Sequence, residues 1–184
     1  MRPGAVPREV VEVALEVALG FRREGDLWPR TVATRDWARF EGLPNHQLVR
    51  GALAVLDVHS GDLTAATPTL YEKLLVSPLG SEAGQTLAVA LAAWVAADGD
   101  PRESILGAVN YGRDCDSYAA VAGGIAGAQH GAAVLPVDWV ATVLTANDGD
   151  GLRRRAAALS SLVAARHADR ARVHADVDAL LCSR

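Results

Sequence analysis

The chain has 184 residues, and half of them are apolar, which is enough for the core of one compact domain. The formal net charge of −4 provides no bulk attraction to nucleic acid, so we expect no nucleic-acid partner. The longest uncharged apolar run, residues 87–97, is too short to span a bilayer, and the first residues contain no apolar signal segment, so we expect a cytoplasmic protein without a membrane partner.

The N-terminal half predicts helices separated by turns. Residues 7–24 begin with a proline and carry an apolar stripe at helical spacing. Asn45 is a good cap for a second helix over 46–57, and Thr67 with Pro68 is expected to open a third. The residues of the second helix that the spacing turns inward are Leu48, Ala52, Val55 and Leu56.

The central part of the chain predicts the middle of a helical bundle. Residues 83–98 are apolar nearly all round, as a helix surrounded by other helices would be. Shorter helices are expected over 101–109 and 136–147, with a helix of small residues over 118–131 between them. No stretch shows the alternation of a β-strand, so the sequence predicts an all-α fold.

We expect a helical domain over residues 1–147, followed by a different kind of segment over 148–184. Asp148-Gly-Asp-Gly151 lacks the remaining acidic positions of a calcium loop and is expected to be a linker. The rest mixes arginine with alanine, leucine and valine at helical spacing. The cluster Arg153-Arg154-Arg155 fits a solvated face, and a docking strip for a partner is the alternative.

Two carboxylates and a hydroxyl fall close together at Asp114, Asp116 and Ser117, just before the helix of small residues. Anionic and neutral oxygens of this kind are the ligands that Mg²⁺ and Ca²⁺ prefer. The positive end of the following helix stabilises carboxylates at the same place. The alternative is a helix cap, since Asp or Ser before a helix commonly accepts hydrogen bonds from its first amides.

Glycines recur every fourth residue in the helix of small residues, at Gly123, Gly127 and Gly131. One face of this helix therefore carries no side chains. Because each interior glycine costs a helix about 1 kcal/mol relative to alanine, we expect a neighbouring helix or a ligand to approach its backbone closely.

The run from Ala108 to Gly131, followed by Leu135-Pro136 and Trp139, resembles the C-terminal signature of the ADP-ribosylglycohydrolases, which include the dinitrogenase reductase-activating glycohydrolases. Residues 85–94 resemble the family helix that precedes this signature, and the similarity covers residues 79–143. It implies a compact orthogonal helical bundle of the family type that lacks the N-terminal part.

The resemblance also implies a reaction, namely Mg²⁺-dependent hydrolysis of the glycosidic bond that joins ADP-ribose, or a related ribosyl nucleotide, to a protein side chain or a small acceptor. One or two Mg²⁺ ions are the implied cofactor, and no catalytic residue is identified. The implied metal ligands are Asp114, Asp116 and Ser117. The residues implied to contact substrate are Asn110, Gly112, Ser81 and Glu82, with capping of the next helix as the alternative for the last two.

Half of the metal site of the family is missing from the sequence. In the family, further ligands come from a Thr/Ser-Asp-Asp set in the N-terminal half, and this chain has no Asp-Asp pair. We therefore expect a complementary polypeptide to complete the enzyme. An oligomer of this chain is a further expected partner, which would bury apolar surface but would not restore the absent residue types. The alternatives are a non-catalytic module that binds ADP-ribose and a structural partner subunit with an incomplete metal site.

Overall fold

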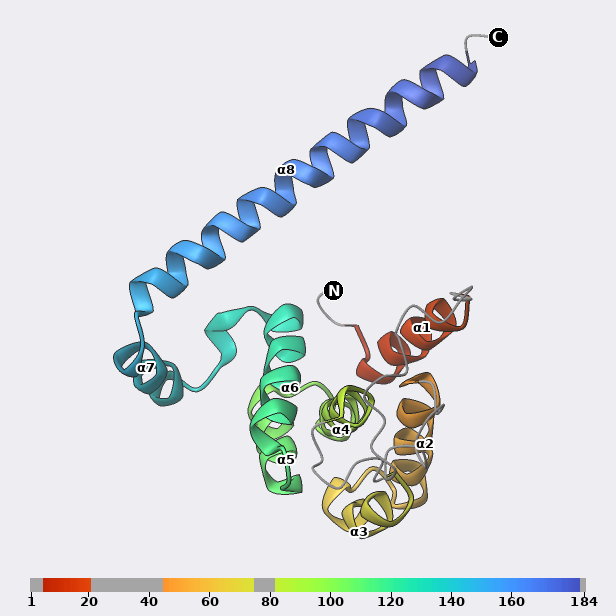
Figure 1. The fold of residues 1–184 in the computed structure, drawn as a ribbon, viewed down its shortest axis with the longest axis vertical. Coiled ribbons are helices and arrows are strands. Elements are labelled where there is room, and N and C mark those ends of the chain that lie inside the picture. The colour runs from red at the N-terminus through yellow and green to blue at the C-terminus, as the bar shows by residue number, and fades with distance from the viewer. Residues whose placement is uncertain (1–4, 21–44, 75–81, 183–184) are drawn as a thin grey trace, which may run out of the picture. The chain divides into compact units, whose positions relative to one another are not determined.

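The computed structural model describes residues 5–20, 45–74 and 82–182, and these contain helices and no strand (Figure 1). The chain divides into two compact units, Met1–Leu135 and Pro136–Arg184. The predicted all-α fold class is confirmed. The elements of the first unit are α1 (Pro7–Gly20), α2 (Asn45–Val58), α3 (Leu63–Leu74), α4 (Ala83–Ala96), α5 (Pro101–Tyr111), α6 (Cys115–His130) and the 3-10 turn η2 (Ala132–Val134); those of the second are α7 (Val137–Ala146) and α8 (Gly149–Cys182).

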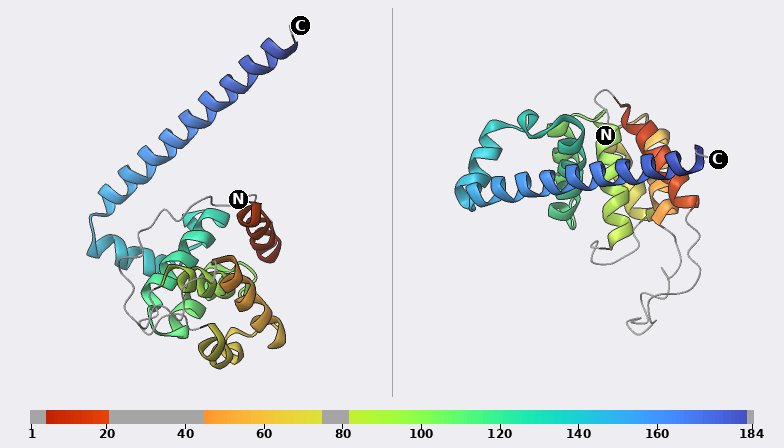
Figure 2. Two further views of the ribbon diagram at one scale, coloured as in Figure 1. Left: turned by 45° about the vertical axis from the view of Figure 1, so that its right-hand side comes forward. Right: turned by 90° about the horizontal axis from the view of Figure 1, so that it is seen from above.

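Helix α4 forms the centre of the first unit and packs against α2, α5 and α6 (Figures 1 and 2). Its sequence is apolar on all sides, so each face can be covered by a neighbour without burying unpaired polar groups. The prediction that this helix lies in the middle of the bundle is confirmed. Its buried residues are Gly84, Gln85, Ala88, Val89, Ala90, Ala92, Ala93 and Trp94.

Helices α1 and α2 supply the apolar layer on one side of the core. The four residues of α2 that the spacing turned inward are all buried. Val11 and Leu15 of α1 are buried as well. The predicted end of the first helix, after Gly20, lies outside the described residues.

A buried glutamine, Gln129, connects three parts of the first unit. Its Oε1 accepts a hydrogen bond from Trp94 Nε1 of α4 at 3.1 Å, and its Nε2 donates to the carbonyl oxygen of Ala5 at 2.9 Å. Both ends of the amide are satisfied, so the group can be buried without a large desolvation cost. The start of the described chain is thereby fixed against the ends of α4 and α6.

The prediction that Thr67 and Pro68 open a helix is wrong, because α3 already begins at Leu63. The side chain of Asp62 accepts a hydrogen bond from the Ala65 amide at 3.1 Å and so caps the helix earlier. Pro68 consequently lies inside α3, where it has no amide hydrogen for the carbonyl four residues back.

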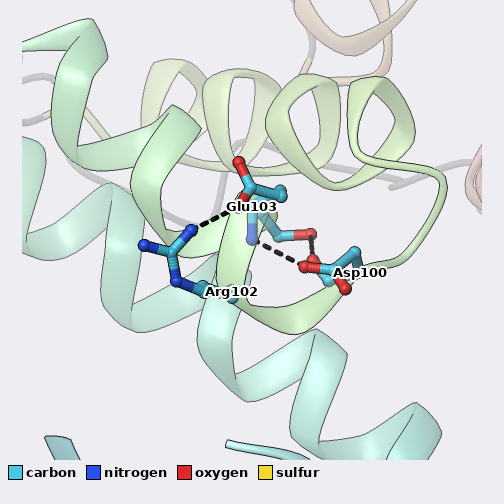
Figure 3. A network of polar contacts seen from close by, with 4 residues as sticks. Asp100, Arg102 and Glu103 are labelled. Atoms are coloured by element: carbon cyan, nitrogen blue, oxygen red, sulfur yellow. Dashed lines mark hydrogen bonds and ion pairs between the residues drawn. The ribbon is translucent and has the colours of Figure 1, made fainter. Parts of the chain in front are cut away.

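Helix α5 has a complete N-terminal cap, drawn in Figure 3. The side chain of Asp100 accepts from the Glu103 amide at 2.8 Å, and the Ser104 hydroxyl donates to the Asp100 carbonyl at 2.5 Å. Arg102 forms an ion pair with Glu103 at 2.5 Å on the exposed side. Pro101 at the first position needs no hydrogen-bond partner, so the start of α5 is fixed by local chemistry alone.

The expected linker over residues 148–151 is not present, because α8 begins at Gly149. The side chain of Asp148 accepts a hydrogen bond from the Gly151 amide at 2.9 Å, and the carbonyl oxygen of Asp148 accepts one from the Leu152 amide at 2.9 Å. Asp148 therefore caps α8, and the two glycines are absorbed into its first turn. None of the helices in the described part of the chain combines the length and apolar character that crossing a bilayer requires.

Candidate metal and substrate site

A tight turn connects α5 to α6 and carries the predicted metal ligands. Gly112 and Arg113 both have positive φ angles, of 84° and 57°. A Cβ atom at Gly112 would lie 3.2 Å from the hydroxyl oxygen of Tyr71, so this position suits glycine in both conformation and space. The guanidinium of Arg113 lies 5.3 Å from the centre of the Tyr71 ring, an attractive arrangement that offsets part of the cost of its left-handed backbone.

The three predicted metal ligands lie at the N-terminal end of α6. Asp114 immediately precedes the helix, and Asp116 and Ser117 belong to its first turn. Asp114 and Ser117 are half-buried, whereas Asp116 is exposed. The end of a helix that these residues occupy carries partial positive charge, which stabilises their carboxylates.

Asp114 occupies the capping position but does not cap. Its side chain makes no hydrogen bond to the first amides of α6. Asp100 and Glu82 stand at the same position of α5 and α4, and each accepts an amide hydrogen bond there, at 2.8 and 2.9 Å. The geometry therefore does not support the capping alternative for Asp114, and its carboxylate oxygens are not committed to the helix.

Three tyrosines hold this turn in place. The ring of Tyr111 stacks on that of Tyr71, with centroids 4.8 Å apart, and meets the edge of Tyr118 at 5.7 Å. The hydroxyl of Tyr71 donates a hydrogen bond to the Tyr111 carbonyl. Burial, the main cause, raises the pKa of the Tyr111 hydroxyl well above its usual value, so this phenol stays neutral.

The first turn of α4 adjoins the first turn of α6 through Gln85 and Tyr118. Gln85 Nε2 donates to the Tyr118 hydroxyl at 3.2 Å, and both side chains are buried. Burial raises the pKa of Tyr118; the hydrogen bond from Gln85 opposes the rise, and the negative charge of Asp114 adds to it. Sequence reasoning missed this pair, and its one signal was a glutamine inside a helix predicted to be buried.

The predicted substrate contacts have different surroundings in the structure. Glu82 caps α4 through the Gln85 amide, which favours the capping alternative for this residue, and Ser81 lies outside the described residues. Asn110, in the last turn of α5, is exposed at the wall of a cavity of about 200 Å³. Leu63, Thr64, Thr67 and Pro68 of α3 and Gly107, Asn110 and Tyr111 of α5 line this cavity.

The expectation of a close neighbour along the glycines of α6 holds at one position only. A Cβ atom at Gly123 would lie 3.3 Å from Ile105 Cδ1, so α5 approaches α6 there. At Gly127 and Gly131 a Cβ atom would meet no described atom within 4 Å. Gly131 instead ends α6 with a φ of 81°, a conformation that glycine adopts without strain.

The described residues offer an incomplete set of metal ligands. Among them, no three His, Cys, Asp or Glu side chains are grouped closely enough to hold a metal ion. Two carboxylates match in number what one hydrated Mg²⁺ commonly takes from a protein, because Mg²⁺ keeps several waters. Two adjacent Mg²⁺ ions do not fit these two carboxylates, because four positive charges would face two negative ones.

The described part of the first unit is an all-α bundle in which Asp114, at the N-terminal end of α6, makes no cap hydrogen bond. The model of the ADP-ribosylglycohydrolase family matches residues 5–172. The chain therefore belongs to the ADP-ribosylglycohydrolase family. The match extends to both sides of residues 79–143, on which the resemblance was based. Comparisons with curated proteins and with solved structures gave no match.

Proposed function

We propose that the chain takes part in the Mg²⁺-dependent hydrolysis of a glycosidic bond to ADP-ribose or a related ribosyl nucleotide. Membership of the family supports a glycohydrolase-like function. In this proposal Asp114, Asp116 and Ser117 hold Mg²⁺ through their oxygens. The bound ion would supply positive charge for the sugar hydroxyls and for an attacking water.

The observation that supports the proposal best is the free geometry of Asp114. A carboxylate at a helix N-terminus usually accepts an amide hydrogen bond, as Asp100 does on α5. Asp114 makes no such bond although it is half-buried and directly precedes the helix. A metal ion would satisfy those oxygens in place of the amides.

We further propose that a complementary polypeptide supplies the remaining ligands. Two carboxylates and one hydroxyl suit a single hydrated ion, and no larger group of ligating side chains lies within the described residues. The substrate would be an ADP-ribosylated protein or a small ribosyl nucleotide. Its acceptor side would then be recognised at the interface of the two chains.

Isothermal titration of the purified chain with MgCl₂ and with ADP-ribose tests the metal site. We expect weak Mg²⁺ binding that Asp114→Asn and Asp116→Asn each abolish. Asp138→Asn is the matched control, since Asp138 also lies in the first turn of a helix, α7, but in the other unit. Mg²⁺ binding that is equal in all three variants would contradict the assignment.

A second candidate function rests on the same incomplete ligand set. A chain that lacks a full metal site can serve as a non-catalytic, ADP-ribose-binding or structural partner subunit. Binding of ADP-ribose without Mg²⁺, unchanged in Asp114→Asn and Asp116→Asn, would favour this candidate over hydrolysis.

A further inference from the structure

The cavity between α3 and α5 has a lining without charge. The two helices pack against each other within the first unit, and seven of their residues line the cavity. Its polar groups come from two threonines and one asparagine, and the four apolar or aromatic lining residues are Leu63, Pro68, Gly107 and Tyr111. Phosphate and carboxylate groups are bound most strongly by charged donors, and this lining has none. The cavity therefore suits an uncharged group.

The size of the cavity limits what it can hold. Pockets that enclose a whole drug-sized ligand measure about 300–1,000 Å³. The volume here is about 200 Å³, so the cavity accommodates a single ring system of a larger ligand.

Gly107 lets the two helices meet without filling the cavity. Inside a helix such as α5, glycine costs about 1 kcal/mol relative to alanine. A Cβ atom at Gly107 would lie 3.2 Å from Leu63 Cδ2, and both residues belong to the lining. A methyl group at this position would therefore crowd the place where α3 and α5 come together.

The α3 side of the cavity contributes hydrogen-bond acceptors. Pro68 has no amide hydrogen for the carbonyl oxygen of Thr64, four residues earlier, and both residues line the cavity. The Thr67 hydroxyl already donates its proton to the Leu63 carbonyl at 2.8 Å, so the oxygen of this hydroxyl is left as an acceptor. A ligand that carries N–H donors matches this side.

The α5 side of the cavity contributes an amide group. Asn110 lines the cavity with an exposed side chain, whose amide can both donate and accept hydrogen bonds. The adenine base likewise carries both kinds of group, an exocyclic amine that donates and ring nitrogens that accept. An uncharged flat ring with donors and acceptors on its edges therefore matches both sides.

We propose that this cavity holds the adenine base of ADP-ribose or of a related nucleotide. The exocyclic amine would donate to the Thr64 carbonyl oxygen, and a ring nitrogen would accept from the Asn110 amide. The identity of the ligand rests on the proposed function. Within such a nucleotide, the base is the uncharged flat ring, whereas the phosphates are anionic.

The cavity also lies within reach of the candidate metal ligands. Asn110 lines the cavity, and Asp114 follows it by four residues, which span at most about 14 Å. Between them, the hydrogen bond from the Tyr71 hydroxyl to the Tyr111 carbonyl fixes α3 to the end of α5. A base in the cavity and a ribose at Asp114 are therefore compatible with one extended ligand.

Isothermal titration of the full chain with adenosine in the presence of EDTA tests the cavity without the metal site. We expect adenosine to bind at least tenfold more tightly than inosine, in which an oxygen replaces the exocyclic amine. A site that hydrogen-bonds a donor group rejects the analogue that lacks it. Pro68→Ala supplies an amide for the Thr64 carbonyl, so it should weaken adenosine binding more than inosine binding.

A pair of glycine variants tests the place of binding. Gly107→Ala should weaken adenosine binding at least tenfold. The matched control, Gly124→Ala, adds the same methyl group to α6, where a Cβ atom would meet no described atom within 4 Å. It should change binding less than twofold. Both substitutions favour the helical state, and circular dichroism of each variant establishes that the fold is retained.

Three results would overturn the proposal: no heat from adenosine at millimolar concentration, equal affinities for adenosine and inosine, or equal binding by the two glycine variants. The proposed function fails separately. If adenosine behaves as expected but Mg²⁺ does not bind, the base site stands and the metal site falls. If ADP-ribose binds with Mg²⁺ and Gly107→Ala has no effect on it, the metal site stands and the base site falls.

Discussion

Gln85 Nε2 and the Tyr118 hydroxyl are 3.2 Å apart and join the first turn of α4 to the first turn of α6. This hydrogen bond is buried, and Tyr118 belongs to the helix that Asp114 immediately precedes. A buried hydrogen bond between two side chains stabilises a fold by about 1 kcal/mol. The position of the candidate site therefore depends on a polar contact within an otherwise apolar interior.

We expect Gln85→Met and Tyr118→Phe each to lower the free energy of unfolding by about 1–2 kcal/mol. Because both changes remove the same contact, the double variant should lose less than the sum of the two. Urea unfolding followed by circular dichroism gives the three values. Strict additivity would show that the two side chains do not interact in solution.

The aspartates before α5 and α6 should respond differently to truncation. Asp100→Ala removes an observed cap and should cost about 1 kcal/mol of stability. Asp114→Ala removes no cap hydrogen bond and should change stability by less than about 0.5 kcal/mol. Thermal unfolding of the two variants beside the parent chain provides the comparison. A larger loss from Asp114→Ala than from Asp100→Ala would restore the capping role of Asp114.

Asp148→Ala should loosen the start of α8 without unfolding the rest of the chain. The variant loses the side-chain bond to the Gly151 amide, and two glycines in the first turn already weaken the helix there. Amides near residues 151–154 should exchange with solvent about fivefold faster, as expected for a lost cap of about 1 kcal/mol. Asp148→Asn should retain most of the protection, because asparagine caps nearly as well.

The buried tyrosines predict a loss of stability at high pH. Burial raises the pKa of Tyr111 and of Tyr118 above the value near 10 of an unfolded chain. Below pH 10 both states keep the phenol protons, so these groups cause no pH dependence. Above it the unfolded chain releases protons that the folded chain retains, and the free energy of unfolding falls by up to about 1.4 kcal/mol per pH unit for each group.

Urea unfolding between pH 9 and pH 11 measures this effect. Tyr118→Phe and Tyr111→Phe should each reduce the slope, since phenylalanine has no proton to release. Equal slopes in the parent chain and the Tyr111→Phe variant would show that Tyr111 is not kept neutral by burial.

The periodicity of apolar residues in the sequence was sufficient to predict the helical bundle and its central helix. The spacing of Leu48, Ala52, Val55 and Leu56 and the apolar run of α4 each define a buried face without reference to other segments. Helix starts were less predictable, because both Asp62 and the proline at position 68 can begin a helix and the structure uses the aspartate. The linker prediction failed for the same reason. The two glycines of residues 148–151 suggested a loop, whereas Asp148 caps a helix that includes them.

The candidate site was predictable only in its residue types. The pattern of Asp114, Asp116 and Ser117 indicates oxygen ligands and their place before a helix. The contact of Gln85 with Tyr118 joins residues 33 positions apart in the sequence, and no local pattern encodes it. The cavity beside Asn110 is likewise formed by α3 and α5 together, so it results from tertiary packing.

The hydrogen bond from Gln129 to the Ala5 carbonyl spans 124 positions of the chain. During synthesis this hydrogen bond therefore cannot form before residue 129 has been made. Contacts of such long range form late, because a large loop must close before they are gained. Ala5, ahead of the first helix, should accordingly gain this contact only after the end of α6 has left the ribosome.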